Sequence, residues 1–281
     1  MYTQIWKKCH ASVCQLSFIN ARGVCVDILT GFKVKNYLIT SHNAFAMDKA
    51  HLVEIAFVGE DANTVTASIR IPYAEFNNEH RIGVLNNNGY YAVYEIDFQE
   101  FQKIPGLQLS KRREFNIGSQ VVSMVFCCGL SSLSLRQGYI SSLGTNNDGN
   151  RFIHVDGHLS YGNGGAPLID PQTLEVIGIL TYRDIPSTSS FKQIIDAVSF
   201  NLQELKKVET SVKFGGIDPI QVLIANQNQL KLLAKSIYKY SMTNHPMAVT
   251  LDRIITFFDE DVIYHSEGTK ASEEESDIFF A

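Results

Sequence analysis

One glycine-rich stretch, residues 162–167 (GNGGAP), is the part of the chain best suited to chemistry. Three glycines within four residues make a tight loop whose main chain can approach another group closely, because no Cβ stands in the way. Main-chain N–H groups in such a loop can donate hydrogen bonds to a carbonyl or carboxylate oxygen. The loop contains no nucleophilic side chain, so the chemistry that it offers by itself is the binding of an oxygen.

The loop and the residues after it resemble the nucleophile loop of trypsin-like serine proteases, most closely of the HtrA type. The family pattern is Gly-[Asp/Asn]-Ser-Gly-Gly-Pro-Leu, followed by a hairpin that ends in a Val-Ile-Gly-Ile-like strand. Residues 162–168 match this pattern in register, Asp170-Pro171 supplies a turn, and residues 176–182 supply the strand. In this register Gly164 occupies the position of the nucleophilic serine.

Two more segments resemble the landmarks that carry the other triad residues. Residues 37–42 (YLITSH) are similar to the family's strand ending in Leu-Thr-Ala-Ala-His, which places His42 at the general-base position. Residues 90–97 (YYAVYEID) match the family's Asp-Ile-Ala-Leu-Leu-x-Ile-Asp strand at its apolar positions and its final aspartate. The triad aspartate, however, is replaced by Tyr90.

The resemblance extends over about residues 10–210. Residues 138–144 (GYISSLG) are similar to an HtrA-type strand, and residues 195–201 followed by 202–208 are similar to the family's last strand and its short terminal helix. The fold that this implies is mostly β, a two-barrel chymotrypsin-like domain with a C-terminal helical extension.

The chemistry of the three triad positions argues against catalysis. A serine protease needs a nucleophilic oxygen, a base that reaches it, and a carboxylate that holds the base in the correct tautomer. Only His42 is present. Gly164 cannot attack a carbonyl, and Tyr90 cannot stabilise an imidazolium as a carboxylate does, a loss that costs roughly 10⁴ in rate in chymotrypsin-type enzymes. No functional catalytic residue is therefore expected at His42, Tyr90 or Gly164.

An enzymatic interpretation of these positions stays open beside the inactive one. Ser41 and Ser160 lie close to the triad positions in sequence but not at the loop apex, so neither is well placed as a substitute nucleophile. An engineered replacement of serine would explain Gly164 and leave Tyr90 unexplained. A cytosolic serine-type endopeptidase, inactivated or using non-standard residues, is therefore the alternative enzyme hypothesis.

The resemblance also implies a ligand-binding set around the loop. Main-chain N–H groups of Gly162 and Gly164 can form an oxyanion hole, with Asn163 between them. His154 and His158 flank the loop where family members build the pocket for a substrate side chain. Each histidine is either a wall or core residue or a group that recognises a polar or acidic peptide side chain; His158 is included in the predicted ligand-binding set.

The cysteines indicate neither a disulfide scaffold nor a metal site. There are five, an odd number without regular spacing. Cys127 and Cys128 lie in an apolar run and are interpreted as buried small residues, poorly placed to pair with His42. The group of Cys9, His10 and Cys14 lacks paired Cys-x-x-Cys spacing, so no metal is expected. Reduced cysteines favour a cytoplasmic location.

The composition excludes several classes of partner. The chain is 45% hydrophobic with a formal net charge of −5, so no nucleic-acid binding is expected. The basic cluster 111–113 is interpreted as a solvated loop. No apolar run reaches the roughly 18 residues of a transmembrane helix, and residues 10–17 are too polar for a signal-peptide core. Neither a membrane partner nor a cofactor is expected.

Short strands with turn signals dominate the first two hundred residues. Alternating residues predict strands over 11–19 and 23–29, and a hairpin from 53–59 and 64–71. Together with the landmarks above, they predict a trypsin-like domain over residues 1–211.

After Val208 the pattern changes to that of helices. Asp218-Pro219 supplies an N-cap followed by proline at the first helical position, and apolar residues then recur at helical spacing to about Met242. This stripe is expected to dock on the chain's own domain, with a partner surface as the alternative. Residues 251–264 could be helix or strand. The extension is predicted over 212–265, and residues 266–281 form an acidic tail expected to be disordered.

The sequence thus favours a catalytically inactive protease homologue that binds a peptide or protein partner between its barrels. Two alternatives stay open. One is the endopeptidase described above. The other is a structural subunit that acts through the 217–242 helix. Oligomeric state is not indicated by any motif.

Overall fold

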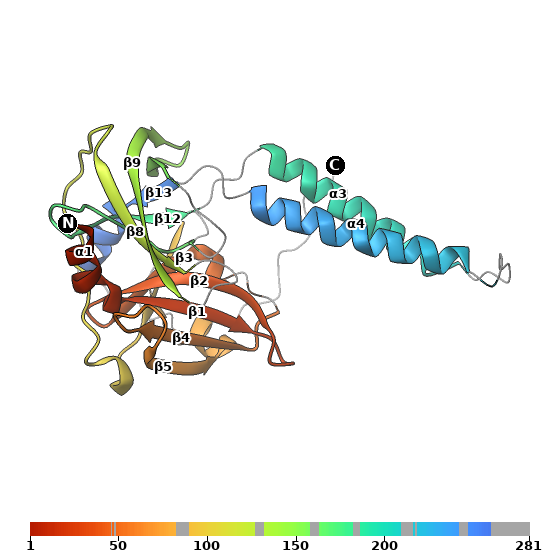
Figure 1. The fold of residues 1–281 in the computed structure, drawn as a ribbon, viewed down its shortest axis with the longest axis horizontal. Coiled ribbons are helices and arrows are strands. Elements are labelled where there is room, and N and C mark those ends of the chain that lie inside the picture. The colour runs from red at the N-terminus through yellow and green to blue at the C-terminus, as the bar shows by residue number, and fades with distance from the viewer. Residues whose placement is uncertain are drawn as a thin grey trace, which may run out of the picture.

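The computed structural model describes residues 1–45, 47, 49–82, 90–126, 132–157, 163–181, 186–208, 216, 218–241 and 247–259. Most of the described chain is β-structure, followed by helices towards the C-terminus (Figure 1). The strands are β1 Val13–Ile19, β2 Cys25–Val34, β3 Tyr37–Ser41, β4 Leu52–Val58, β5 Val65–Pro72, β6 Arg81–Ile82, β7 Tyr91–Glu95, β8 Gln120–Phe126, β9 Leu133–Thr145, β10 Arg151–Asp156, β11 Pro167–Ile169, β12 Val176–Thr181 and β13 Met247–Thr250. The α-helices are α1 Tyr2–Cys9, α2 Tyr73–Asn78, α3 Pro186–Leu205, α4 Pro219–Ser241 and α5 Asp252–Asp259, and 3₁₀ turns cover η1 His10–Ser12, η2 His42–Phe45 and η4 Gln99–Phe101.

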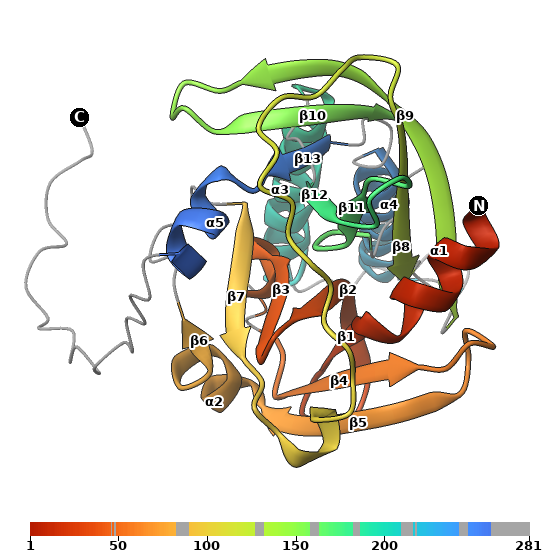
Figure 2. The same ribbon diagram turned by 90° about the vertical axis from the view of Figure 1, so that its left-hand side faces the viewer.

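The N-terminal half of the chain forms a barrel-like antiparallel sheet with strand order β5-β4-β1-β2-β3-β7-β6 (Figure 2). The alternation expected over 11–19 and 23–29 sets its register. Leu16 of β1 lies opposite Leu29 of β2 and Ile55 of β4, and all three side chains are buried. Alternate residues of a strand point to one face, so one row of apolar side chains fills the interior of this sheet.

The second sheet is a closed barrel with strand order β10-β13-β12-β11-β8-β9. Its sixth strand, β13, follows helices α3 and α4 in the sequence. It closes the barrel, because Ile179 of β12 pairs with Val249 and Ile153 of β10 pairs with Ala248. The two predicted barrel-like sheets are therefore present, and the helices towards the C-terminus are present as well.

The predicted last strand at 195–201 and short helix at 202–208 are wrong. Residues 186–205 form the single helix α3. Its buried residues Val198 and Leu202 are four positions apart, which is the spacing of one helix face and not of a strand. Within the described residues the last strand is β13 and the last helix is α5, so the start of 251–264 is helical.

The second barrel consequently does not end at residue 211. Helices α3 and α4 form an insertion between β12 and β13, and β13 lies inside the segment that the sequence assigned to a helical extension. The acidic segment 266–281 lies outside the described residues.

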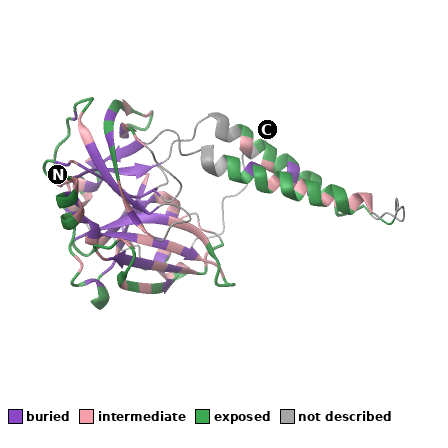
Figure 3. Cartoon of the chain, viewed as in Figure 1, coloured by how far each residue is buried: buried purple, intermediate pink, exposed green. Residues whose placement is uncertain are grey.

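Helix α4 begins as predicted. The Asp218 carboxylate accepts a hydrogen bond from the N–H of Ile220 at 2.8 Å, and Pro219 is the first helical residue. Its docking differs from the expectation, because α4 packs along α3 in a hairpin that projects away from the barrels (Figure 1). In Figure 3 buried residues concentrate in the barrels, and the hairpin is mostly exposed. No helix in the described part of the chain is long and apolar enough to cross a membrane.

The two barrels share one apolar core. Phe32 and Ile39 of the first sheet pack with Val122, Ile179 and their neighbours of the second barrel. Tyr90 is partly buried against this cluster, and each barrel has a further cluster of its own.

Candidate functional site

His42 lies at the end of β3, where the strand turns into η2. Leu38 and Ile39 anchor the strand because both side chains are fully buried. The hydroxyl of Ser41 accepts a hydrogen bond from the N–H of Asn43 at 3.3 Å, so this side chain closes the turn. The turn presents His42 as a half-buried residue beside the second barrel.

Tyr90 lies next to His42 because β7 pairs with β3. Ser41 and Tyr91 are partners in this pairing, which brings the preceding Tyr90 to the histidine. The two ring centroids are 5.7 Å apart and the rings meet edge to face at 76°. The Tyr90 hydroxyl accepts a hydrogen bond from Asn146 Nδ2 at 3.2 Å, so it is directed to the second barrel and not to the imidazole.

The Tyr90 ring links the two barrels. It packs edge to face on Phe152 of β10, with centroids 5.0 Å apart, and Asn146 lies in the turn between β9 and β10. Tyr90 has a φ of +62°, a conformation that costs a non-glycine residue roughly 1–2 kcal/mol. Contacts with His42, Asn146 and Phe152 hold this strained residue in place. The position that carries the aspartate in the family pattern is therefore a structural joint here.

The electrostatics of His42 favour its neutral form. Burial lowers the pKa of His42 below its ordinary value of 6.5, and the nearby main chain of Tyr90 opposes this shift only in part. Its Nδ1 atom is buried and has no hydrogen-bond partner of good geometry among the described residues. In a working triad this atom donates to the aspartate, which stabilises the imidazolium that forms during catalysis. His42 lacks that support.

The loop 163–166 is clamped between the two barrels. The carbonyl of Gly164 accepts a hydrogen bond from the N–H of Thr30 on β2 at 3.1 Å, and the N–H of Gly165 donates to Leu180 on β12 at 2.8 Å. Gly165 has a φ of +88°, and a Cβ there would lie 2.3 Å from the Thr30 carbonyl and 2.5 Å from the Ser41 nitrogen. Only glycine fits such a position. The loop thus brings residue 164 to the segment that holds His42.

The predicted ligand-binding residues are described only in part. Asn163 is fully buried, and its carbonyl accepts a hydrogen bond from the N–H of Ala166 at 3.1 Å. Its side chain therefore belongs to the inside of the loop, and any ligand contact here would use main-chain groups. Gly162 and His158 lie outside the described residues, as do Ser160, Cys127 and Cys128.

His154 lies on β10 with its ring against β9. Its Nε2 would be 3.3 Å from a Cβ placed on Gly144, so the ring covers that glycine. This position agrees with the interpretation of His154 as a wall residue.

The residues considered for a metal site are engaged elsewhere: Cys9 and Cys14 pack in two apolar clusters, and His10 holds the N-terminal helix. The His10 Nδ1–H donates to the Trp6 carbonyl at 2.7 Å, and the two rings stack with centroids 5.4 Å apart. Cys14 is fully buried, which raises the pKa of its thiol. Among the residues that the structure describes, no group of three His, Cys, Asp or Glu side chains is arranged to hold a metal ion.

Sequence reasoning missed two residues that shape the site. Thr30 binds the loop through its main-chain N–H. Its carbonyl accepts a hydrogen bond from the Thr40 hydroxyl at 2.7 Å, and its hydroxyl accepts one from the Phe126 N–H at 3.0 Å. Asn146 anchors Tyr90 from 56 positions further along the chain. Neither residue belongs to a family motif, and only the turn propensity of residues 146–149 (NNDG) could have drawn attention to Asn146.

The family assignment follows from a model of the trypsin-like peptidase domain, which matches residues 23–179, more than half of the chain. The protein belongs to this family. The matched range includes His42, Tyr90 and Gly164. No curated protein matches the sequence.

The chain is similar to solved structures of HtrA-type and related proteases. The HtrA-type protease AlgW with a tripeptide has a TM-score of 0.50 and 19% identity, and the alignment covers 64% of this chain and 54% of AlgW. A serine endoprotease from Yersinia pestis has a TM-score of 0.49 and 19% identity, with 66% and 58% covered. The chain thus spans little more than half the length of these proteins. The likeness to AlgW supports the two-barrel chymotrypsin-like fold and nothing finer.

Proposed function

We propose that the protein is a catalytically inactive trypsin-like protease homologue that binds a peptide or protein segment between its barrels. The observation that carries this proposal is the contrast within the site. The backbone of the loop is held by Thr30 and Leu180, whereas the attacking hydroxyl is absent at Gly164 and the orienting carboxylate is absent at Tyr90.

The chemistry of the described groups supports an inactive site. With Gly164 in the nucleophile position, no acyl-enzyme can form there. Burial lowers the pKa of His42 and so favours its neutral form, no carboxylate among the described residues is paired with it, and the oxygen of Tyr90 is used by Asn146. Each change alone would impair proteolysis, and the two together leave no route for the standard reaction.

Binding needs none of these lost groups. An extended segment can be held by main-chain hydrogen bonds at a sheet edge, with a side-chain pocket supplying the choice of sequence. Glycines at 162 and 164 leave room for a main-chain carbonyl to approach, and the absence of the serine side chain enlarges that room. We place this activity in the cytoplasm, since the five cysteines lack the regular spacing of a disulfide scaffold.

Labelling with a fluorophosphonate tests the loss of catalysis. We expect no labelled serine and no cleavage of casein by the full chain. Gly164→Ser alone should yield little activity, because Tyr90 cannot hold a charged His42. Gly164→Ser with Tyr90→Asp should be faster than the single variant by several orders of magnitude. A labelled wild-type serine, or full activity of the single variant, would support the endopeptidase hypothesis instead.

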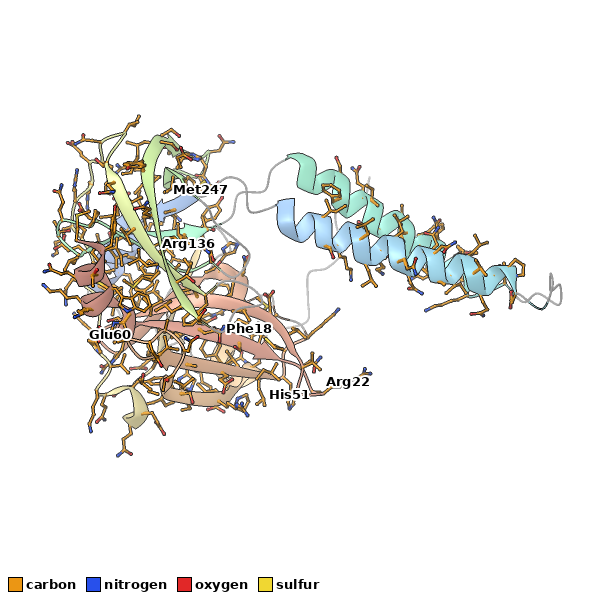
Figure 4. All side chains as sticks on the ribbon, viewed as in Figure 1. Phe18, Arg22, His51, Glu60, Arg136 and Met247 are labelled. Carbon is orange, nitrogen blue, oxygen red and sulfur yellow. The ribbon has the colours of Figure 1, made fainter. Side chains whose placement is uncertain are left out.

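Peptide selection tests binding separately from catalysis. A random peptide library is selected on the immobilised full chain, and the enriched peptides are measured against two variants. His42→Trp fills the space beside Tyr90 and should weaken binding at least tenfold. The matched control Glu60→Trp adds the same side chain to the exposed β4–β5 turn near the N-terminal helix (Figure 4) and should leave binding unchanged. Equal affinities for the wild type and both variants would place the binding elsewhere.

A second candidate function has its own observation. The apolar side chains exposed on α4 favour a structural subunit that works through its helices. In this case the site between the barrels is a remnant, and library selection should return no peptide that depends on His42.

A further inference from the structure

The α3–α4 hairpin exposes more apolar side chain than its own packing uses. Large apolar residues of α4 are 40–66% exposed. They are Val222, Leu223, Leu230, Leu232, Leu233 and Ile237. Exposed residues of this size are ordinary when scattered singly, but a group along one helix indicates a contact surface.

Most of these side chains lie in a row. Leu223, Leu230 and Ile237 follow one another at intervals of seven residues, and Leu233 lies in the gap between the last two. Seven residues make almost two turns of helix, so the side chains lie on one face. Helix α3 has a shorter row at the same spacing, in which Ile194, exposed to 42%, is the one large apolar residue and is followed by Ala197 and Asn201.

Both rows lie on the same side of the hairpin. The seam between the helices contains the buried Val198 and Leu202 of α3 and Ala234 of α4. In each helix the exposed row is rotated by roughly 90° from this seam, in the same sense about its own axis. Because the two helices run in opposite directions (Figure 1), equal rotations bring the two rows to one face of the hairpin.

We propose that this face is the interface between two copies of the chain, which pack hairpin against hairpin as a four-helix bundle. The first reason is that the seam buries few side chains completely: Val198, Leu202 and Ala234 are buried, whereas Ile195 of α3 and Ile224 of α4 are only half-buried. Gln227 has a buried side-chain oxygen without a hydrogen-bond partner among the described residues, and Lys231 is half-buried in the same seam. Helices in proteins are stabilised mainly by packing of an apolar face, and here most of that face is exposed.

The second reason is charge. Helix α4 contains no acidic residue. Lys231 lies in the seam and Lys235 is rotated to the side opposite the row, so the row has no charge among its described residues. Cores of protein interfaces are depleted of charge. A charged partner would find no complement in the row of α4, whereas a second copy presents the same uncharged apolar row; on α3 the row continues to Glu204, which pairs with Lys207 of its own chain at 2.6 Å.

The third reason is symmetry. The row on α4 is evenly spaced about Leu230, so an antiparallel pair about a two-fold axis places Leu230 against Leu230 and Leu223 against Ile237. Such self-complementary contacts are characteristic of two-fold dimers. The hairpin projects away from the barrels (Figure 1), so the barrels of the two copies would lie at opposite ends of the bundle.

The size of the face is sufficient for a stable dimer. Helix α4 has 23 residues and is therefore about 34 Å long. A face two helices wide measures roughly 20 Å across. The product is on the order of 700 Å² per copy, close to the ~800 Å² per partner of standard interfaces.

Sedimentation of the full chain from about 1 μM to about 1 mM tests the proposal. We expect a concentration-dependent dimer. Leu230→Glu sets two carboxylates against each other at the two-fold axis and should weaken the dimer at least about 100-fold. The matched control Leu232→Glu changes a residue on the same helix that is 66% exposed but lies outside the row, and it should dimerise like the wild type. A monomer at every concentration, or equal weakening by both variants, overturns the proposal.

Cysteine crosslinking tests the direction of the pairing. Under mild oxidation Leu230→Cys should form a covalent dimer with itself. Leu223→Cys should crosslink only when mixed with Ile237→Cys, because the antiparallel register brings these two together. The native chain under the same oxidant gives the background from its own cysteines. Crosslinking of Leu223→Cys with itself, or no crosslink beyond the background from any variant, contradicts the antiparallel bundle.

Discussion

The two barrels and the α3–α4 hairpin differ in how they use their apolar residues. In the barrels, side chains as large as Phe18, Phe32 and Tyr94 are completely buried. In the hairpin, Leu232 and Phe200 are more than 60% exposed. Burial of an aliphatic or aromatic side chain contributes about 1.5–3 kcal/mol, so the stability of the chain resides in the barrels. The hairpin adds an accessible surface, and its two ends connect to barrel strands.

Two neighbouring glycines of the candidate site also differ in their roles. Gly165 is required by space, because a side chain there would enter the main chain of β2 and β3. Gly164 lies where the family pattern has the attacking serine. Gly165 therefore preserves the architecture of the loop, and Gly164 is the residue on which the proposed loss of catalysis depends.

The largest effect should come from removing β13, which lies beyond the hairpin. Truncation after Val208 deletes a strand that pairs with both β10 and β12, so the second barrel cannot close. We expect loss of the cooperative thermal transition. The free energy of unfolding of a typical domain is only about 5–15 kcal/mol, and losing a barrel strand should remove more than that.

A matched deletion separates the strand from the helices. Replacing residues 186–241 by a short Gly-Ser linker removes the hairpin and keeps β13. We expect this protein to unfold cooperatively with a melting temperature close to that of the wild type, as followed by circular dichroism. If the linker variant fails to fold while the chain truncated after Val208 remains folded, the stability of the protein does not reside in the barrels.

Next in size is the effect of Gly165→Ala. A Cβ at this residue meets the Thr30 carbonyl at 2.3 Å, and the φ of +88° is itself unfavourable for alanine. We expect a loss of at least about 3 kcal/mol in the free energy of unfolding, measured by urea titration. Gly23→Ala is the control, because Gly23 has a φ of +76° but open space around it. Its cost should stay near 1–2 kcal/mol; similar losses for both variants would mean that conformation and not contact dominates.

A smaller effect is expected from Tyr90→Phe. This change keeps the ring between His42 and Phe152 and removes the hydroxyl that accepts from Asn146. The expected cost is about 1 kcal/mol, the usual net contribution of one hydrogen bond. A double-mutant cycle with Asn146→Ala isolates the pair, and the coupling energy should account for most of that cost. Additive effects would show that Tyr90 and Asn146 do not join the barrels through this bond.

The sequence predicted the features that local patterns encode. Alternation defined β1 and the β4–β5 hairpin, and motifs in register brought His42, Tyr90 and Gly164 to one site. The prediction failed where a match to a family motif disagreed with the spacing of apolar residues. Residues 195–201 were matched to a strand, although Ile195, Val198 and Leu202 repeat at the spacing of a helix. The four residues of β13 follow the insertion and carry no motif, so only pairing with distant strands identifies them.

The residues that contact the site from distant parts of the chain could not be predicted from the sequence either. The contacts of Tyr90 with Asn146 and Phe152, and of the loop with Thr30, depend on how two barrels meet. Single residues of ordinary type carry no signal for such contacts. Tyr90 could therefore be identified as a missing aspartate but not as a joint between the barrels.

The smallest predicted effect is a dependence of stability on pH that originates from His42. Burial lowers the pKa of the folded histidine below its ordinary value of 6.5. At a pH below that value the unfolded chain binds more protons than the folded one, so the contribution of His42 is fully present above pH 6.5 and is lost as the pH falls towards the lower folded pKa. A single group can change the free energy of unfolding by at most about 1.4 kcal/mol per pH unit. Urea titrations between pH 7 and pH 5 should therefore show a steeper loss for the wild type than for His42→Gln, which cannot be protonated. Parallel losses in the two proteins would mean that the pKa of His42 is not lowered in the folded chain.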